Sequence, residues 1–284
     1  MEPAVYFPVT TTPLAMRAGL QPFGVDLGNG ERDAHFFQRD DQRAEYQRQK
    51  RAVVDDRHVV VADTDAHRAV HGAALRFVRE RLHAEHGTAL TELADLADGH
   101  ALAARWQSVA DTVQEDMALL HRGDDDDGDT IMLNVCFPSG WRPERLRRAS
   151  FTEIHAPVPD FVKDPRASRS MVRSMVERGP YVRFVWTISA DDVLDHHPEH
   201  GRRRPFDDDV TDGFLRIERQ VTVPFADVGG SLFLIRTFLR PFSSLDVDER
   251  ATVREALAVM PDEIAAYKGL TAGRARMMAL LDRV

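Results

Sequence analysis

Hydrophobic residues recur at helical spacing in the first third of the chain. Apolar positions from Ala69 to Leu82 repeat every three or four residues, which predicts an amphipathic helix that ends near His86-Gly87. The residues Asp63-Thr64-Asp65 precede this pattern, and any of them can cap the helix at its amino end. A short apolar run from His58 to Ala62 comes before these caps and predicts a strand.

Helical spacing continues from about Leu90 to Leu120, with a possible break at Asp98-Gly99. An acidic run, Asp124 to Asp127, comes next and continues through Gly128-Asp129. Charges of one sign packed this closely repel one another, so the run predicts a solvated loop. Calcium binding is the less favoured alternative, because the spaced oxygen ligands and the terminal glutamate of an EF-hand are missing.

The second half of the chain has a different pattern. Segments rich in β-branched and aromatic residues predict strands at Ile131 to Phe137, Tyr181 to Ile188, Phe214 to Val223 and Ser231 to Leu239. The turn Val228-Gly229-Gly230 joins the last two as a hairpin. Helices are expected at Asp248 to Met260, Asp262 to Tyr267 and Ala272 to Leu281. This order of elements predicts an α+β fold, and because no domain boundary is evident we treat residues 1–284 as one domain.

Charge and hydropathy narrow the classes of partner. The net charge of −9 argues against a nucleic-acid partner, which would require a basic face, and it favours a cationic over an anionic small molecule. The sequence lacks an apolar run of about 18 residues, and its start does not resemble a signal peptide. We therefore expect no membrane span and a cytoplasmic location.

The usual sequence signatures of cofactor binding are missing, and Cys136 is the single cysteine. Dinucleotide-binding, Walker, His-Glu-x-x-His and nucleophile-elbow motifs do not occur. A lone cysteine is most often a small buried apolar residue, although a thiolate can also ligate haem iron.

Charged residues interrupt two of the predicted strands. In the strand from Phe214 to Val223, alternation places Arg216, Glu218 and Gln220 on one face and the apolar residues on the other. In the last predicted strand, Arg236 has apolar neighbours on both sides. A buried charge must be paired or must face a cavity. Glu218 and Arg236 therefore either pair with each other or line a pocket, and alternation alone does not decide between these possibilities.

Histidines stand out in two places. His196, His197 and His200 are followed by Arg202, Arg203 and Arg204, which would repel a metal ion, so we expect a solvated loop there. His155 lies instead between Ile154 and two nearby prolines, which stiffen the backbone. Such a setting suits an imidazole with a fixed direction, either as a structural histidine or as a haem ligand.

Several blocks of sequence carry a family resemblance. Val135-Cys-Phe-Pro-Ser139-Gly-Trp141, followed by Ile154-His-Ala-Pro-Val-Pro159, resembles the signature region of the haem-dependent oxidative N-demethylases, relatives of dimethylamine monooxygenase. Further blocks resemble the family in the same order along nearly the whole chain: Pro13 to Leu20, Val113 to Met117, Arg216 to Gln220, Leu234 to Leu239 and Met260 to Leu270.

The resemblance implies a PAS-like antiparallel sheet with additional helices on its N- and C-terminal sides, binding haem b. His155 would be the proximal ligand of the iron. Glu218 would deliver a proton or hold a cationic amine, and Arg236 would act with it in catalysis. The resemblance also implies arginines for the haem propionates or for distal hydrogen bonds: Arg183, Arg216, Arg219 and Arg236.

The implied reaction hydroxylates an N-methyl carbon with O2 or peroxide, and the product collapses to an amine and formaldehyde. The chain has neither the length nor the cysteines for a flavin and iron–sulfur module, so a separate reductase would supply electrons unless peroxide is used. Alternatives remain at this point: N-oxygenation in specialised metabolism, a haem-based gas or redox sensor, a non-haem iron site of His155 with His196, His197 or His200, and a partner subunit that has lost its cofactor.

Overall fold

A seven-stranded antiparallel sheet organises the molecule. The computed structural model describes residues 1–11, 19–88, 101–124, 126–159, 165–200 and 203–283. The strand order is β1-β5-β6-β7-β3-β4-β2. The strands are β1 (Gln21–Pro22), β2 (His58–Val60), β3 (Asp116–His121), β4 (Asp129–Asn134), β5 (Tyr181–Ser189), β6 (Phe214–Phe225) and β7 (Gly230–Pro241). The predicted α+β class and the β6–β7 hairpin are thereby confirmed.

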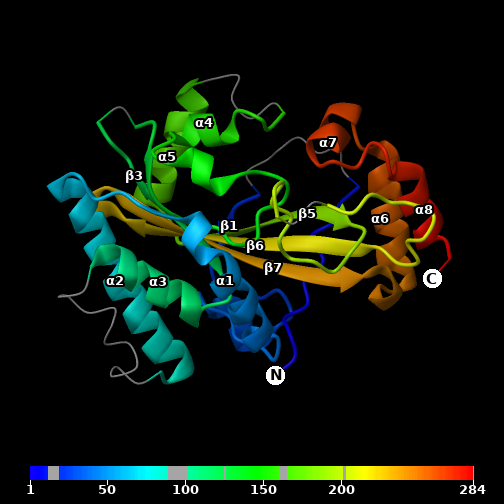
Figure 1. Cartoon of the computed structure of the whole chain (residues 1–284), viewed down its shortest axis with the longest axis horizontal. Helices are drawn as coiled ribbons and strands as arrows, with labels where there is room; N and C mark the ends of the chain where they lie inside the picture. Colours follow the sequence, from blue (N-terminus) through cyan, green and yellow to red (C-terminus); the bar gives the residue numbers. More distant parts are fainter. Residues whose placement is uncertain (12–18, 89–100, 125, 160–164, 201–202, 284) are drawn as a thin grey trace.

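Helices cover both faces of this sheet. They are α1 (Arg43–Arg57), α2 (Asp65–His86), α3 (Leu102–Thr112), α4 (Phe151–His155), α5 (Pro165–Glu177), α6 (Val247–Val259), α7 (Asp262–Tyr267) and α8 (Arg274–Leu281). Figure 1 shows α2 and α3 on one side of the sheet, α4 and α5 on the other, and the last three helices together at one end.

The two faces of the long central strands differ in chemistry. On one face, Leu215, Ile217, Val221 and Val223 of β6 are buried together with apolar residues of the neighbouring strands. Residues 216, 218 and 220 lie on the opposite face, as alternation predicts. The sheet therefore has an apolar face that forms the core and a polar face that is available for chemistry.

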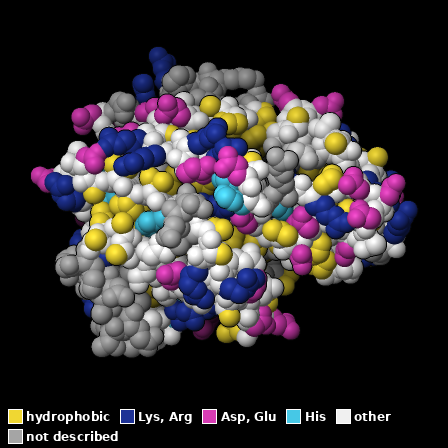
Figure 2. Space-filling view, in the orientation of Figure 1, with side chains coloured by type: hydrophobic (Ala, Val, Ile, Leu, Met, Phe, Trp, Pro, Cys, Tyr) yellow, Lys and Arg dark blue, Asp and Glu magenta, His cyan; other side chains and the backbone are white. Residues whose placement is uncertain are grey.

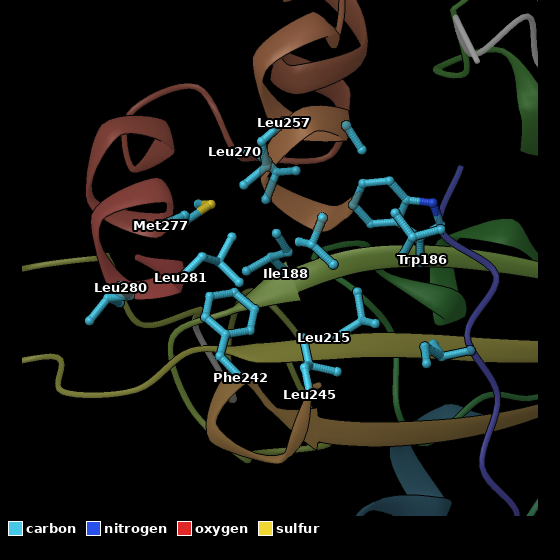
Figure 3. Close-up of a cluster of buried hydrophobic side chains, with 14 of the residues drawn as sticks. Trp186, Ile188, Leu215, Phe242, Leu245, Leu257, Leu270, Met277, Leu280 and Leu281 are labelled. Carbon is cyan, nitrogen blue, oxygen red and sulfur yellow. The ribbon is translucent and has the colours of Figure 1, made fainter. Parts of the chain in front are cut away.

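The apolar face is covered in two parts. Near α2 and α3, side chains such as Val70, Leu75 and Trp106 pack on β3, β6 and β7. At the other end, the three C-terminal helices pack against Trp186 and Ile188, as Figure 3 shows. Burial of side chains of this size stabilises the fold by about 1.5–3 kcal/mol each.

Helix α2 forms as its sequence predicts. Thr64 caps it by accepting a hydrogen bond from the backbone N–H of His67 at 3.1 Å, and Gly87 ends it in the left-handed conformation that glycine tolerates. Its buried positions, among them Val70, Ala74 and Val78, recur at the predicted spacing.

Part of the predicted second helix is wrong. Residues Leu102–Thr112 form α3, but Asp116–His121 is strand β3. The residues Met117 to Leu120 favour helix in isolation. They become a strand because β4 and β7 offer hydrogen-bonding partners on both sides, and tertiary packing overrides the local preference. The suggested break at Asp98-Gly99 lies outside the described residues.

Helix α2 approaches β7 so closely that only glycine fits at the start of that strand. A Cβ on Gly230 would lie 2.3 Å from Cγ1 and 2.9 Å from Cγ2 of Val70. We expect Gly230→Ala to lower the free energy of unfolding by about 1–3 kcal/mol, because the helix must move away from the sheet.

A glycine inside α2 provides the matched control for this prediction. A Cβ on Gly72 would meet only the flexible end of Arg76, at 3.4 Å. Gly72→Ala should therefore raise stability by up to about 1 kcal/mol. Denaturant unfolding of both variants measures the two effects, and an unchanged stability for Gly230→Ala would contradict the close contact.

The charge of the surface and the hydropathy of the helices relate to the expectations about nucleic acid and membranes. Figure 2 shows basic and acidic side chains interspersed on the face in view, without a continuous basic patch there. Among the helices of the described residues, none combines the length and the apolar character that crossing a membrane requires.

Candidate functional site

The polar face of the sheet carries a chain of hydrogen bonds centred on Glu218 of β6. Nε of Arg183 donates to Oε1 of Gln220 at 2.7 Å, and Nε2 of Gln220 donates to Oε2 of Glu218 at 2.9 Å. Nε of Arg216 lies 3.9 Å from Oε1 of Glu218. Strand register explains the grouping, because Arg183 is paired with Gln220 across β5 and β6. The structure thus brings together Arg183, Arg216 and Glu218 of the predicted site.

Two further cations, which the sequence analysis did not assign to the site, belong to the same cluster. Lys268, just after α7, donates from Nζ to the carbonyl of Trp186, and its ammonium lies 4.7 Å from the centre of the Trp186 ring. Arg203 donates to the carbonyl of Lys268 and to the hydroxyl of Ser139. We call the following residues the Glu218 cluster: Glu218, Arg183, Arg203, Arg216 and Lys268.

Arg203 follows the histidine segment for which a solvated loop was predicted, and it is only partly exposed. Its guanidinium is held by Lys268 and Ser139, and the charge of Glu218 acts on it. The sequence contained a partial signal, because Ser139 and Lys268 both belong to blocks that carry the family resemblance. Nothing in the spacing of the chain indicated that Arg203 would connect these two blocks.

Burial dominates the electrostatics of the Glu218 cluster. It lowers the pKa of Lys268 to about 8, and it lowers the pKa of each of the three arginines. Glu218 opposes the shift in all four residues, because its negative charge favours their protonated forms. At neutral pH, four largely buried cations therefore share one carboxylate.

The other carboxylates that act on these arginines are held by partners of their own. They pair as follows: Asp191 with His196 at 2.8 Å, Asp195 with Arg57 at 2.8 Å and Asp116 with Lys50 at 3.3 Å. An excess of buried positive charge is costly unless an anion compensates it. The cluster is therefore suited to bind an anionic group.

His155 ends helix α4, a short helix held by a capping box. Ser150 accepts from the N–H of Glu153 at 3.2 Å, and the carboxylate of Glu153 accepts from the N–H of Ser150 at 2.8 Å. This Ser-x-x-Glu pattern is a signal of a helix start that the sequence analysis did not use. Nδ1 of His155 lies 2.8 Å from the carbonyl oxygen of Phe151, so this nitrogen carries the proton and donates it.

The imidazole of His155 is neutral at pH 7. Burial lowers the pKa of His155 to about 4, the hydrogen bond to Phe151 partly offsets this shift, and the charge of Arg183 adds to it. With the proton on Nδ1, the lone pair lies on Nε2, which is the form in which histidine binds a metal. The influence of Arg183 also connects His155 electrostatically to the Glu218 cluster.

Arg219 and Arg236 lie on the other face of the sheet. They are directly opposite each other across β6 and β7, whereas Glu218 is opposite Thr237. Arg219 donates to the carbonyls of Asp33 and His35, at 3.2 and 3.0 Å. The structure therefore separates these two arginines from the rest of the predicted site.

Arg236 has a carboxylate partner, but it is not Glu218. Nη2 of Arg236 donates to Oδ2 of Asp40 at 2.8 Å, and the guanidinium carbon lies 3.9 Å from the centre of the Tyr46 ring. The suggested pair between Glu218 and Arg236 is therefore wrong, because β-strand alternation sends the two side chains to opposite faces. The catalytic role predicted for Arg236 would require it to leave its bond with Asp40.

The bond between Arg236 and Asp40 yields a prediction about stability. Both side chains are almost fully buried, so Asp40→Asn leaves a buried guanidinium without its counter-charge. We expect the free energy of unfolding to fall by ~3–5 kcal/mol, while the amount of any haem bound by the folded fraction stays unchanged. Denaturant titration and haem quantification test this prediction. Loss of haem from an otherwise stable variant would show that Arg236 contributes to haem binding.

The remaining histidines do not join His155. His196 and His197 lie in a loop as predicted, but they are buried, so the prediction that this loop is solvated is wrong for both of them. Their Nε2 atoms lie 2.8 Å from Asp191 and 3.2 Å from Glu144, whereas His200 is exposed. Within the described residues, the one group of potential metal ligands with atoms within 4.8 Å of one another lies elsewhere. The suggested iron site of His155 with these histidines is therefore not formed.

Cys136 is fully buried, as expected for a lone cysteine. Burial raises the pKa of its thiol to about 12, with a smaller contribution from Asp116. The thiol is protonated at neutral pH, and a protonated thiol is a poor metal ligand. We therefore do not expect Cys136 to ligate iron.

A comparison with protein families agrees with these features. The family model described as haem-dependent oxidative N-demethylase, alpha subunit-like, matches residues 31–278. The matched range contains His155 and the whole Glu218 cluster. The chain belongs to this family, and the resemblance inferred from its sequence blocks is confirmed.

Proposed function

We propose that this protein is a haem-dependent oxidoreductase that removes a methyl group from an amine. The observation that carries the proposal is the Glu218 cluster, in which four largely buried cations share one carboxylate and the charge of Arg183 acts on the neutral imidazole of His155. Membership of the N-demethylase family supports the same conclusion. The antiparallel sheet, in which β7 lies between β6 and β3, supports a PAS-like core.

The residues fit haem b in the chemistry of their donor groups. His155 would hold the iron through Nε2, because its Nδ1 proton is donated to Phe151 and its low pKa keeps the ring neutral. Arg183 and Arg203 are each only partly exposed, and we propose that they bind the carboxylates of the porphyrin side chains. Two propionates would supply the negative charge that the cluster lacks.

Arg216 has a different role in this proposal. Its terminal nitrogens donate to the carbonyls of Leu194 and Phe137, at 2.8 and 2.7 Å, and the residue is fully buried. These bonds fix the direction of the guanidinium, whose Nε faces Glu218. We therefore propose that Arg216 positions Glu218 rather than binding haem directly.

When bound, haem supplies the activation of O2 or peroxide and the oxidation of the methyl carbon. The protein supplies the remaining functions. Glu218, which is 19% exposed, would hold a protonated amine by charge and could accept its proton. Release of formaldehyde from the hydroxylated methyl group leaves the demethylated amine. Electrons would come from a separate reductase, unless peroxide serves as the oxidant.

Expression with a haem precursor tests this proposal. We expect a Soret band, close to one haem per chain as its pyridine complex, and formaldehyde release from one of a panel of methylated amines supplied with a reductase and O2, or with peroxide. Turnover that gives an oxygenated amine without formaldehyde would indicate N-oxygenation instead. A colourless protein under these conditions would refute the haem proposal.

A further inference from the structure

Three potential metal ligands meet on the face of the sheet opposite the Glu218 cluster. They are His67 in the first turn of α2, His121 at the end of β3 and Asp129 at the start of β4. One ligand atom from each lies within 4.8 Å of the other two. The two imidazole rings are 5.2 Å apart between centroids and are inclined at 73°.

The positions of β3, β4 and α2 bring these three side chains together. His121 and Asp129 are directly opposite each other in the β3–β4 ladder, so their side chains project from the same face. His121 is also paired with Gly230 of β7, the glycine that allows α2 to approach the sheet. His67 lies one helical turn before Val70, which contacts this glycine, so its ring is held above the hairpin.

One ring nitrogen of each histidine in this group lacks a hydrogen-bond partner within the described residues. Nδ1 of His67 and Nδ1 of His121 are both buried, and neither has a hydrogen-bond partner within the described part of the chain. A buried polar atom without a partner requires an explanation, and an absent ion is one of the recognised ones. His71, one turn further along α2, differs: its Nδ1 accepts from Trp106 at 2.8 Å and its Nε2 donates to Val61 at 3.0 Å.

We propose that His67, His121 and Asp129 bind a divalent first-row transition metal ion, with Zn2+ as the representative case. Two imidazoles and one carboxylate are a ligand set for Zn2+ or Fe2+, whereas Ca2+ and Mg2+ prefer oxygen ligands alone. Bonds of about 2.0–2.2 Å bring the ligand atoms of a tetrahedral site to roughly 3.5 Å from one another. The ligand atoms, which lie within 4.8 Å of one another, would have to move closer to reach that spacing.

The surroundings of the site are compatible with a cation. The two basic residues adjacent to the ligands in sequence are both engaged. Arg68 pairs with Asp65 and donates to the carbonyl of Ala62, and Arg122 lies 2.7 Å from Glu177 and 3.4 Å from Asp126. Asp129 is exposed, so an ion can enter from solvent, and three protein ligands leave a position for water. The ion would connect the start of α2 to the β3–β4 hairpin, and it would be separate from the proposed haem.

Zn2+ and Co2+ binding to the full-length protein tests the site. The purified protein is treated with a chelator that leaves haem in place, and metal is then counted separately from haem iron. We expect one Zn2+ per chain, at least tenfold weaker binding in Asp129→Asn and His121→Gln, and unchanged binding in His83→Gln, which removes an exposed histidine of α2. Co2+ should give visible ligand-field bands that the Asp129→Asn substitution alters.

Two results would overturn the proposal. One is a wild-type protein that takes up no Zn2+ from a micromolar excess, and the other is a variant pair that binds Zn2+ as tightly as the wild type. Asp129→Asn changes an exposed side chain, so circular dichroism should show an intact fold and its result can be interpreted even if His121→Gln fails to fold. Neither result depends on haem binding, so failure of the metal site can be distinguished from failure of the proposed oxidoreductase function.

Discussion

Replacing His155, the proposed iron ligand, with alanine is expected to weaken haem binding strongly. The imidazole is neutral, its Nδ1 is fixed by the carbonyl of Phe151 at 2.8 Å, and its lone pair is therefore directed from Nε2. Loss of such a ligand should weaken haem binding by ~10–100-fold or more, since changes to partners beyond the ligands already cost that much at metal sites. The haem-to-protein ratio and the position of the Soret band measure the effect.

The control for this variant is His200→Ala. His200 is exposed and lies in the histidine-rich segment that the sequence suggested as an alternative iron site. It should retain a wild-type spectrum. Imidazole added to His155→Ala should restore part of the Soret band, because the substitution leaves space for the missing ring. Equal loss of iron in both variants, or full haem with an unchanged spectrum in His155→Ala, would contradict the assignment.

Periodicity predicted much of the fold because the relevant signals are local. The apolar stripe and the caps of α2 lie within one segment, and strand alternation correctly placed Arg216, Glu218 and Gln220 on one face of the sheet. The same local signals failed at Asp116–His121, where helix-favouring residues become the strand that β4 and β7 require. Propensity describes an isolated segment, whereas the partners of a central strand come from elsewhere in the chain.

The candidate site was less predictable because its partners are distant in sequence. Arg236 pairs with Asp40, which is 196 positions away, and no pattern near either residue indicates this bond. Arg203 reaches Lys268 across 65 positions, so a row of three arginines suggested solvent exposure instead. His155 could be proposed from its rigid surroundings and from the family resemblance, but its tautomer depends on a helix that the sequence analysis did not assign.

Removing the charge of Glu218 is expected to impair turnover while leaving haem bound. Glutamine keeps the size of the side chain and can still accept the hydrogen bond from Nε2 of Gln220, now 2.9 Å long. It removes the carboxylate that opposes the pKa shift in all four cations of the cluster, namely Arg183, Arg203, Arg216 and Lys268. A protonated amine would then meet four cations and no anion, and its proton would have no carboxylate to accept it.

Glu218→Gln should lower turnover without lowering the haem content, and this combination makes the test specific. The kcat should fall by ~100-fold or more, as is typical when a proton-transfer group is lost, and the KM for a cationic amine should rise. The excess positive charge increases, so the propionates should be held at least as tightly and haem content should not fall. The pKa of Lys268, about 8 in the wild type, should decrease because Glu218 raises it.

Glu177→Gln, which removes an exposed carboxylate paired with Arg122, is the control and should behave as the wild type. Unchanged turnover in Glu218→Gln would exclude this carboxylate from the reaction, and loss of haem would instead show that it supports the cofactor.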